Sequence, residues 1–318
     1  LSQVHWLLGQ YGQAVTIGRE AVSESDALLA ERPGELKFRG VLGNACRILG
    51  RALYSSGQAA AARPQFQRAR ELFEGCYAES PTKYDGLTVC ALLELQSTMD
   101  QGTEAAGCSA LLERASKLQN EIISRQPDAV AERSALLTID LQRVSLLVRS
   151  GNVAAATQLI QQEDEQLAKT PDMEPSAVTS LHMVAADLHS YTGDHAAAIA
   201  RLQPALAFAR QWCDREPSKA QPMTQLVSIY WRLANEQQQA GDQAAATANW
   251  QTAVELGETR LSRFPEDQLA PVELAWSISS LALALESRGR RSASADKARL
   301  VSRGVELLGQ IAPTVDAE

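Results

Sequence analysis

Glycine and proline recur along this chain at a nearly fixed spacing, and that repeat constrains the fold more than any other feature of the sequence. Seven of the 19 glycines alternate with seven of the 12 prolines, in the order Gly9, Pro33, Gly57, Pro81, Gly102, Pro127, Gly151, Pro171, Gly193, Pro217, Gly241, Pro265, Gly289 and Pro313. In five of these seven pairs the proline lies 24 residues after the glycine. Such a period predicts an array of similar supersecondary units, each of which buries its apolar face only against its neighbours.

Each unit has the pattern of two helices that are separated by the glycine and ended by the proline. In the second unit, apolar residues at spacings of four, three and four define one face of a first helix: Leu42, Cys46, Leu49 and Leu53. Gly57 follows, and glycine readily adopts the left-handed conformation that ends many helices. A second apolar stripe then leads to Pro81, which cannot continue a helix and disfavours helical geometry in the residue before it.

The arrangement of small and large residues in these units resembles that of tetratricopeptide repeats. The residues that carry the resemblance are Leu49-Gly50, Gly193-Asp194-Ala198, Gly241-Asp242-Ala246, the large side chains Phe66 and Trp250, and the small side chains Ala69, Ala205 and Ala253. The units of that family are about 34 residues long, whereas consecutive glycines here lie 42 to 49 residues apart. In this enlarged length the units are similar to the helical arrays attached to bacterial serine/threonine protein kinases.

The repeat and the resemblance together predict an all-α, right-handed superhelical solenoid of about seven helix-turn-helix units. The expected unit boundaries are 1–33, 34–81, 82–127, 128–171, 172–217, 218–265 and 266–313, within a single solenoid domain over 1–318. The chain starts at Leu1 in the middle of the pattern, so we expect it to be a fragment of a longer protein.

The composition excludes several classes of function for this chain. The net charge of −8 disfavours nucleic acid as a partner, because phosphate binding usually requires a basic surface. No apolar run approaches the ~18 residues of a membrane-spanning helix, so no direct membrane span is expected. The five cysteines form no CxxC pair and are expected to be small buried residues: Cys46, Cys76, Cys90, Cys108 and Cys213.

Motifs for catalysis are absent from the sequence, so we expect no enzyme activity and no cofactor. The chain has no phosphate-binding glycine loop, no GxSxG, no HExxH and no kinase HRD or DFG motif. His182 and His189 lie seven residues apart, about 10 Å along a helix, which is too far for both to bind one zinc ion without other ligands. Metal binding is therefore not expected, and packed or surface histidines are the favoured interpretation.

In tetratricopeptide arrays, the first helix of each unit lines a concave groove that receives a peptide. Carried over by position, the resemblance assigns the following residues to such a groove: Arg47, Arg51, Tyr54, Arg149, Asp187, Tyr191, Trp231, Asn235, Gln238, Trp276, Ser279 and Glu286. Aromatic residues and arginine most often contribute the binding energy of interfaces. Packing of Trp231 and Trp276 between long helices is an equally good interpretation of those two residues.

The sequence therefore predicts a non-catalytic domain that binds a protein or peptide in the groove. The resemblance implies that it is the regulatory or sensory region of a bacterial signalling protein such as a Ser/Thr kinase. Two alternatives stay open: a structural self-association scaffold, which would make the chain a homo-oligomer, and a small-molecule sensor. Its location is also open between the cytoplasm and, if the parent is a membrane-anchored receptor kinase, the extracytoplasmic or periplasmic side.

Overall fold

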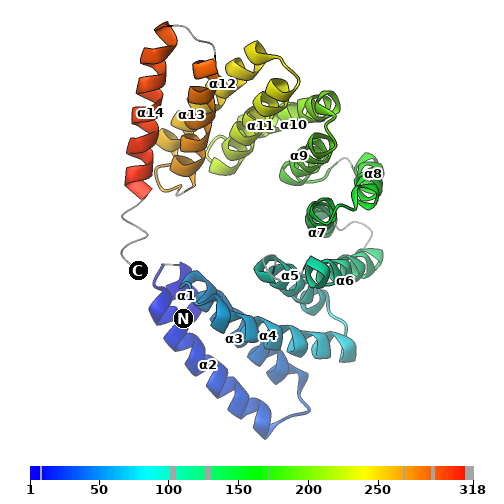
Figure 1. Ribbon diagram of the computed structural model, residues 1–318. Coiled ribbons are helices and arrows are strands. Elements are labelled where there is room, and N and C mark those ends of the chain that lie inside the picture. The colour runs from blue at the N-terminus through cyan, green and yellow to red at the C-terminus, as the bar shows by residue number, and fades with distance from the viewer. Residues whose placement is uncertain are drawn as a thin grey trace. The chain divides into compact units, whose positions relative to one another are not determined.

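The computed structural model describes residues 1–7, 9–100, 105–125, 130–170, 172–267, 269–287 and 291–311, and the regular structure in these ranges is entirely α-helical (Figure 1). The contacts divide the chain into two compact units, Leu1–Ala155 and Ala156–Glu318, which are described one at a time. Within the described ranges, no helix combines the length and the apolar character that crossing a lipid bilayer requires.

The N-terminal unit is a row of helices in which each helix packs on the next one in the chain. Its helices are α1 (Ser2–Leu7), α2 (Tyr11–Glu31), α3 (Leu36–Ser55), α4 (Ala59–Glu79), α5 (Lys83–Asp100), α6 (Ala105–Ser124) and α7 (Val130–Arg149). Helix α1 contacts both α2 and α3. The next helix, α8 (Val153–Lys169), begins in this unit and continues into the second.

The C-terminal unit repeats the same arrangement. After α8 it contains α9 (Pro175–Tyr191), α10 (His195–Arg215), α11 (Ala220–Gln239), α12 (Gln243–Arg263), α13 (Ala270–Ser287) and α14 (Arg291–Ile311). From α9 onward each helix packs on the following one, and α9 also contacts α11, the first helix of the next repeat. The prediction of an all-α array of helix-turn-helix units is confirmed, whereas the single domain and the right-handed superhelix stay predictions.

The repeating glycines end the first helix of each pair by a backbone geometry that glycine adopts without strain. Five of them have a positive φ between 72° and 88°: Gly9, Gly57, Gly151, Gly193 and Gly241. At Gly57 the amide donates to the carbonyl of Tyr54 at 3.1 Å, and the next amide, of Gln58, donates to Leu53 at 2.9 Å. These two bonds use carbonyl groups that the end of the helix leaves free. The other two glycines of the repeat, Gly102 and Gly289, lie outside the described residues.

The residue after the glycine begins the second helix as well. Asp194 and Asp242 each accept a hydrogen bond from the backbone amide three residues later, in both cases at 3.0 Å. An aspartate in this position satisfies one of the amides that the first turn of a helix leaves without a partner. The Gly-Asp pair therefore ends one helix and starts the next within two residues, which makes the turn of each hairpin short.

The repeating prolines lie two residues after the last residue of the second helix. Helices α2, α4, α10 and α12 end at Glu31, Glu79, Arg215 and Arg263, before Pro33, Pro81, Pro217 and Pro265 respectively. The intervening residue has non-helical geometry in each case, for example φ −144° and ψ 89° at Ser80, as expected before proline. The predicted stops are confirmed at these four positions, and Pro127, Pro171 and Pro313 lie outside the described residues.

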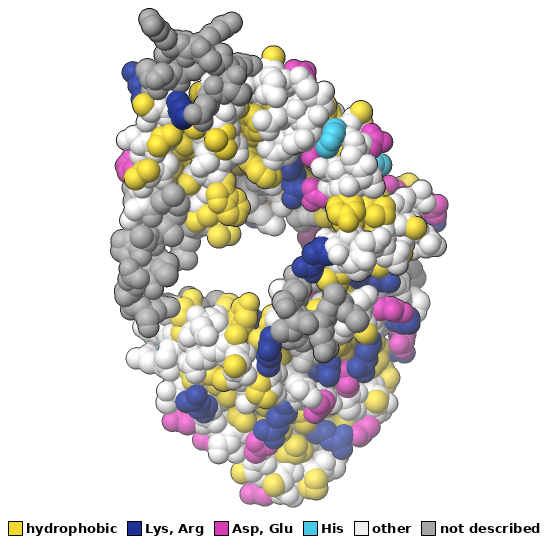
Figure 2. All heavy atoms as spheres, viewed as in Figure 1, with side chains coloured by type: hydrophobic (Ala, Val, Ile, Leu, Met, Phe, Trp, Pro, Cys, Tyr) yellow, Lys and Arg dark blue, Asp and Glu magenta, His cyan; other side chains and the backbone are white. Residues whose placement is uncertain are grey.

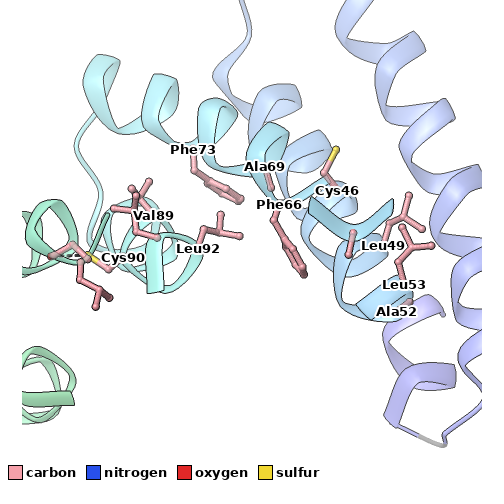
Figure 3. Packing of buried hydrophobic residues seen from close by; sticks show 14 of the residues in the cluster. Cys46, Leu49, Ala52, Leu53, Phe66, Ala69, Phe73, Val89, Cys90 and Leu92 are labelled. Carbon is pink, nitrogen blue, oxygen red and sulfur yellow. Dashed lines mark hydrogen bonds between the residues drawn. The ribbon is translucent and has the colours of Figure 1, made fainter. Parts of the chain in front are cut away.

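The core of the N-terminal unit is formed by large side chains of α4 that fill the space left by glycines of α3. Figure 3 shows Phe66 and Phe73 extending from α4 between α3 and α5, and both rings are fully buried. A Cβ atom on Gly50 would lie 2.7 Å from the Phe66 ring, and one on Gly43 would lie 2.9 Å from the Phe73 ring. Small residues of α3 therefore permit close approach of α4, as the resemblance to tetratricopeptide repeats implies.

The same combination of small and large residues forms the core of the C-terminal unit. Trp250 is 2% exposed, and Ala205 and Ala253 have no exposed surface. Arg260 of α12 is also 2% exposed. Its Nε and Nη2 atoms donate to Asp267 at 2.9 and 2.7 Å, and Nη1 donates to Glu273 of α13. This buried charged group connects α12, the turn after Pro265 and α13.

The cysteines and most of an acidic triplet in α8 are at least partly buried. Four of the five cysteines are buried as free thiols and Cys213 is half-buried, which confirms their interpretation as packing residues. In the acidic triplet Glu163-Asp164-Glu165 of α8, only Glu165 is fully exposed. Glu163 is 9% exposed, and Asp164 pairs with Arg201 of α10.

Candidate functional site

The C-terminal unit has a pocket of about 180 Å³ between α11 and α13, the first helices of two successive repeats. It is lined by Val227, Ser228, Trp231 and Arg232 of α11 and by Glu273, Trp276 and Ser277 of α13. In Figure 2 hydrophobic side chains are open to solvent on the part of this unit that contains these helices. The pocket is therefore an apolar, aromatic surface and not a closed polar cavity.

The two tryptophans of this pocket differ in exposure and in hydrogen bonding. Trp231 is half-buried and packs against the core that contains Trp250 and Leu281. Its indole Nε1 donates to the hydroxyl of Ser280 in α13 at 3.1 Å. Trp276, by contrast, is 64% exposed. Packing between helices thus accounts for Trp231, whereas Trp276 presents most of its ring to solvent.

The charged groups around this pocket are paired within the unit. Arg232 of α11 forms an ion pair with Asp187 of α9, and Glu273 of α13 accepts from the buried Arg260. Close by on α11, Glu236 contacts Nδ1 of His195 at 2.8 Å. Because these charges are compensated internally, the surface offers a partner mainly its aromatic rings.

The N-terminal unit has a second pocket, of about 290 Å³, on the corresponding first helices. It is lined by Trp6 of α1, by Arg47, Arg51, Tyr54 and Ser55 of α3, by Phe66 of α4, and by Ala91, Leu92 and Leu95 of α5. The guanidinium carbon of Arg51 lies 4.1 Å from the centre of the Trp6 ring, and Trp6 Nε1 donates to Ser55 at 2.8 Å. This pocket therefore combines aromatic and apolar walls with two cations.

Comparison with known proteins identifies the fold. No protein-family model and no curated protein matches the sequence. Among solved structures, the chain is similar to BtubC (BKLC) from P. vanneervenii, with a TM-score of 0.58 and 16% identity, over 78% of this chain and 91% of that one. It is also similar to the S. pombe nuclear import adaptor Nro1, with a TM-score of 0.52 and 10% identity, over 88% of this chain and 95% of Nro1. The chain has a tetratricopeptide-like fold.

Most of the predicted groove residues lie on the first helices of this tetratricopeptide-like array, with side chains that are at least partly open to solvent. Arg47, Arg51 and Tyr54 come together in the N-terminal pocket, and Trp231 and Trp276 come together in the C-terminal one. The remaining described members lie on α7, α9, α11 and α13 outside these pocket walls: Arg149, Asp187, Tyr191, Asn235, Gln238 and Ser279. The side chain of Glu286 lies outside the described residues. The groove as a peptide-binding surface stays a prediction.

Sequence reasoning missed several residues of these two sites. Trp6, on the six-residue helix α1, was not assigned to the groove. Its location three residues before Gly9 is the signal that places it at the end of a first helix. Arg232 and Glu273 were also missed, and their charge partners lie on other helices, so sequence spacing alone could not identify them.

The histidines of the tetratricopeptide-like array do not come together as a metal site. In the part of the chain that the structure describes, no three His, Cys, Asp or Glu side chains cluster in a way that could hold a metal ion. His182 is buried against Phe208, with ring centres 6.2 Å apart. Burial lowers the pKa of His182 to about 4, and Arg201 acts in the same direction. Its neutral form therefore dominates near pH 7, as packing in a core requires.

Proposed function

We propose that this chain is a non-catalytic domain that recognises a protein or peptide through the first helices of its repeats. The observation that carries the proposal is Trp276, which is 64% exposed beside the half-buried Trp231 in the pocket of the C-terminal unit. Trp212 and Trp250 in the same unit are buried, so exposure of Trp276 is not general for this residue type. Large exposed apolar surface is typical of interaction sites, and tryptophan often dominates their binding energy.

The fold supports this proposal, since repeat arrays present extended surfaces made of successive helices. One structural neighbour, Nro1, is described as a nuclear import adaptor, and an adaptor acts by contact with other proteins. A fold can nevertheless host unrelated functions, so the proposal depends on the site residues more than on the neighbour.

Within this proposal, the chain would be the regulatory or sensory region of a bacterial signalling protein such as a Ser/Thr kinase. Support comes from the enlarged repeats, whose glycines lie 42 to 49 residues apart. Binding of a partner would then shift the parent protein toward its active or assembled state. The sequence of the parent protein tests this: a kinase glycine loop with HRD and DFG motifs is expected in the same polypeptide, and a parent without them contradicts the kinase assignment.

The binding function is tested by selecting partners from a displayed library of random short peptides. Wild-type protein is expected to enrich a family of peptides, and Trp276→Ala should weaken their binding by about tenfold or more, because aromatic anchors commonly contribute 2 kcal/mol or more. Leu269→Ala is the matched control, since Leu269 is 62% exposed but lies in the turn before α13. Equal loss in both variants, or no enriched peptide, would contradict the proposal.

Self-association is a second candidate function, favoured by an exposed apolar stripe on α14. Val301 and Val305 are 47% and 65% exposed and lie one helical turn apart. Leu307 of the same helix is buried against α13, so the two valines lie on a different face. Light scattering over a range of protein concentrations distinguishes the two functions. A mass that stays that of one chain at all concentrations would exclude assembly through this stripe.

A further inference from the structure

The pocket of the N-terminal unit contains two arginines that lack a carboxylate partner among the described residues. Arg47 Nη2 donates to the side-chain amide oxygen of Asn44 at 2.9 Å, and its buried Nε has no hydrogen-bond acceptor in that part of the chain. Arg51 stacks on Trp6, with its guanidinium carbon 4.1 Å from the ring centre. The two residues are four apart on α3, so their charges lie on one face of the helix and repel each other.

Seven other arginines of the same unit have carboxylate partners, and four of the seven are half-buried like Arg47 and Arg51. These ion pairs are Arg32–Glu35, Arg39–Glu79, Arg68–Asp26, Arg70–Glu74, Arg114–Glu74, Arg125–Glu121 and Arg143–Asp140. The chain as a whole is acidic, with a net charge of −8. Two cations without carboxylate partners in one pocket of an acidic protein therefore indicate a place where an anion is supplied from outside.

The walls of the pocket strengthen any interaction with such an anion. Both arginines are half-buried, and burial, together with the charge of Arg47, lowers the pKa of Arg51. The apolar walls of the pocket include Phe66, which is fully buried, and Leu92, which is almost fully buried. Charge-assisted hydrogen bonds are stronger where water is partly excluded. An incoming negative group would also relieve the repulsion between the two arginines.

We propose that this pocket binds the side-chain carboxylate of an Asp or Glu within an acidic, extended segment of the partner protein. The guanidinium groups of Arg47 and Arg51 would donate to the carboxylate oxygens, a geometry for which arginine is suited. An apolar side chain next to the acidic residue would pack on Tyr54 and Leu95. A volume of about 290 Å³ accommodates side chains of a peptide, and the acidic chain disfavours a polyphosphate such as nucleic acid. This inference rests on the proposed function.

The test uses the full chain and the same displayed peptide library, with each random segment held between fixed flanks so that no free terminus is offered. Selected peptides are expected to carry Asp or Glu at one fixed position beside an apolar residue. Arg47→Gln and Arg51→Gln should each weaken their binding by about tenfold or more, the value of one lost charge-assisted hydrogen bond. Arg32→Gln is the matched control, because Arg32 is an exposed arginine that lies outside the pocket and pairs with Glu35.

The outcomes separate this inference from the proposed function. Replacing the selected Asp or Glu by Asn or Gln in a synthetic peptide should reduce affinity in wild type but have little further effect in Arg51→Gln, as expected for a direct pair. Some selected peptides could depend on Trp276, lack a fixed acidic residue and bind Arg51→Gln with the same affinity as wild type. Such peptides would overturn this inference and leave the proposed function standing. Failure to select any peptide would overturn both proposals. Tighter binding of a synthetic peptide with phosphoserine in place of the selected Asp or Glu would overturn the assignment of a carboxylate.

Discussion

At the scale of single residues, the fold depends on how each side chain is placed relative to water and to its neighbours. His182 shows this most directly, because it is a titratable group that lies 8% exposed in α9. The charged groups near it are Arg201 of α10 and Asp164 of α8, which pair with each other. The ring nitrogen Nδ1 of His182 has no hydrogen-bond acceptor or donor among the described residues.

His182 makes the stability of the protein sensitive to mild acid. Burial lowers the pKa of His182 from 6.5 to about 4, so between these values the unfolded chain binds a proton that the folded chain does not. The free energy of unfolding should therefore fall as pH decreases from 6.5 toward 4, by about 3 kcal/mol from this group. His182→Leu removes this component. Denaturant unfolding at pH values above and within this range checks it, and an unchanged pH dependence in the variant would contradict it.

A second prediction at this scale concerns two glycines of α3 that are in different surroundings. Gly50→Ala would place a Cβ 2.7 Å from the buried Phe66 ring, whereas the same change at Gly40 meets nothing within 4 Å. Overpacking costs about 1–3 kcal/mol, and alanine gains roughly 1 kcal/mol in helix propensity. Gly50→Ala should therefore destabilise the protein by up to about 2 kcal/mol, and Gly40→Ala should stabilise it by up to ~1 kcal/mol. Urea unfolding of both variants is the measurement, and the same sign in both would refute the close-approach argument.

At the scale of helices, the Gly-Asp turn and the proline stop fix where each element begins and ends. These signals act over a few residues, through the left-handed geometry of glycine and the capping bond of aspartate. Connections between hairpins need contacts that are distant in sequence. Arg260 of α12 supplies one, since it binds Asp267 in the following turn and Glu273 in α13. It therefore holds the end of one hairpin against the start of the next.

At the scale of the whole molecule, a repeat array is expected to transmit a destabilising change mainly to adjacent repeats. Arg260→Met leaves two carboxylates without their cation and should cost roughly 3 kcal/mol, the lower end for a buried pair because both carboxylates are partly solvated. Hydrogen exchange should accelerate most in α12 and α13, less in α10 and α11, and not in α2 to α4. Equal acceleration of all protected amides would instead show that the chain unfolds as one cooperative body.

The binding surface was only partly predictable at this scale. The resemblance placed Arg47, Arg51 and Tyr54 on one face, and the structure brings them into one pocket. It also placed Trp231 and Trp276 together, but did not show that only Trp276 is largely exposed. Exposure depends on how closely neighbouring helices approach, and that distance is set by side chains of several repeats together.

The sequence by itself determined the helical hairpin and its period, because helix ends depend on local backbone geometry and on hydrogen bonds within a few residues of Gly57 or Asp194. Only the tertiary structure decided which charges are compensated. Arg260 acquires Glu273, and Trp6 acquires Arg51 and Ser55, through the packing of separate helices. The physical reason is that turn geometry is a property of a few consecutive residues, whereas pairing of side chains requires the register between helices that the turns alone do not specify.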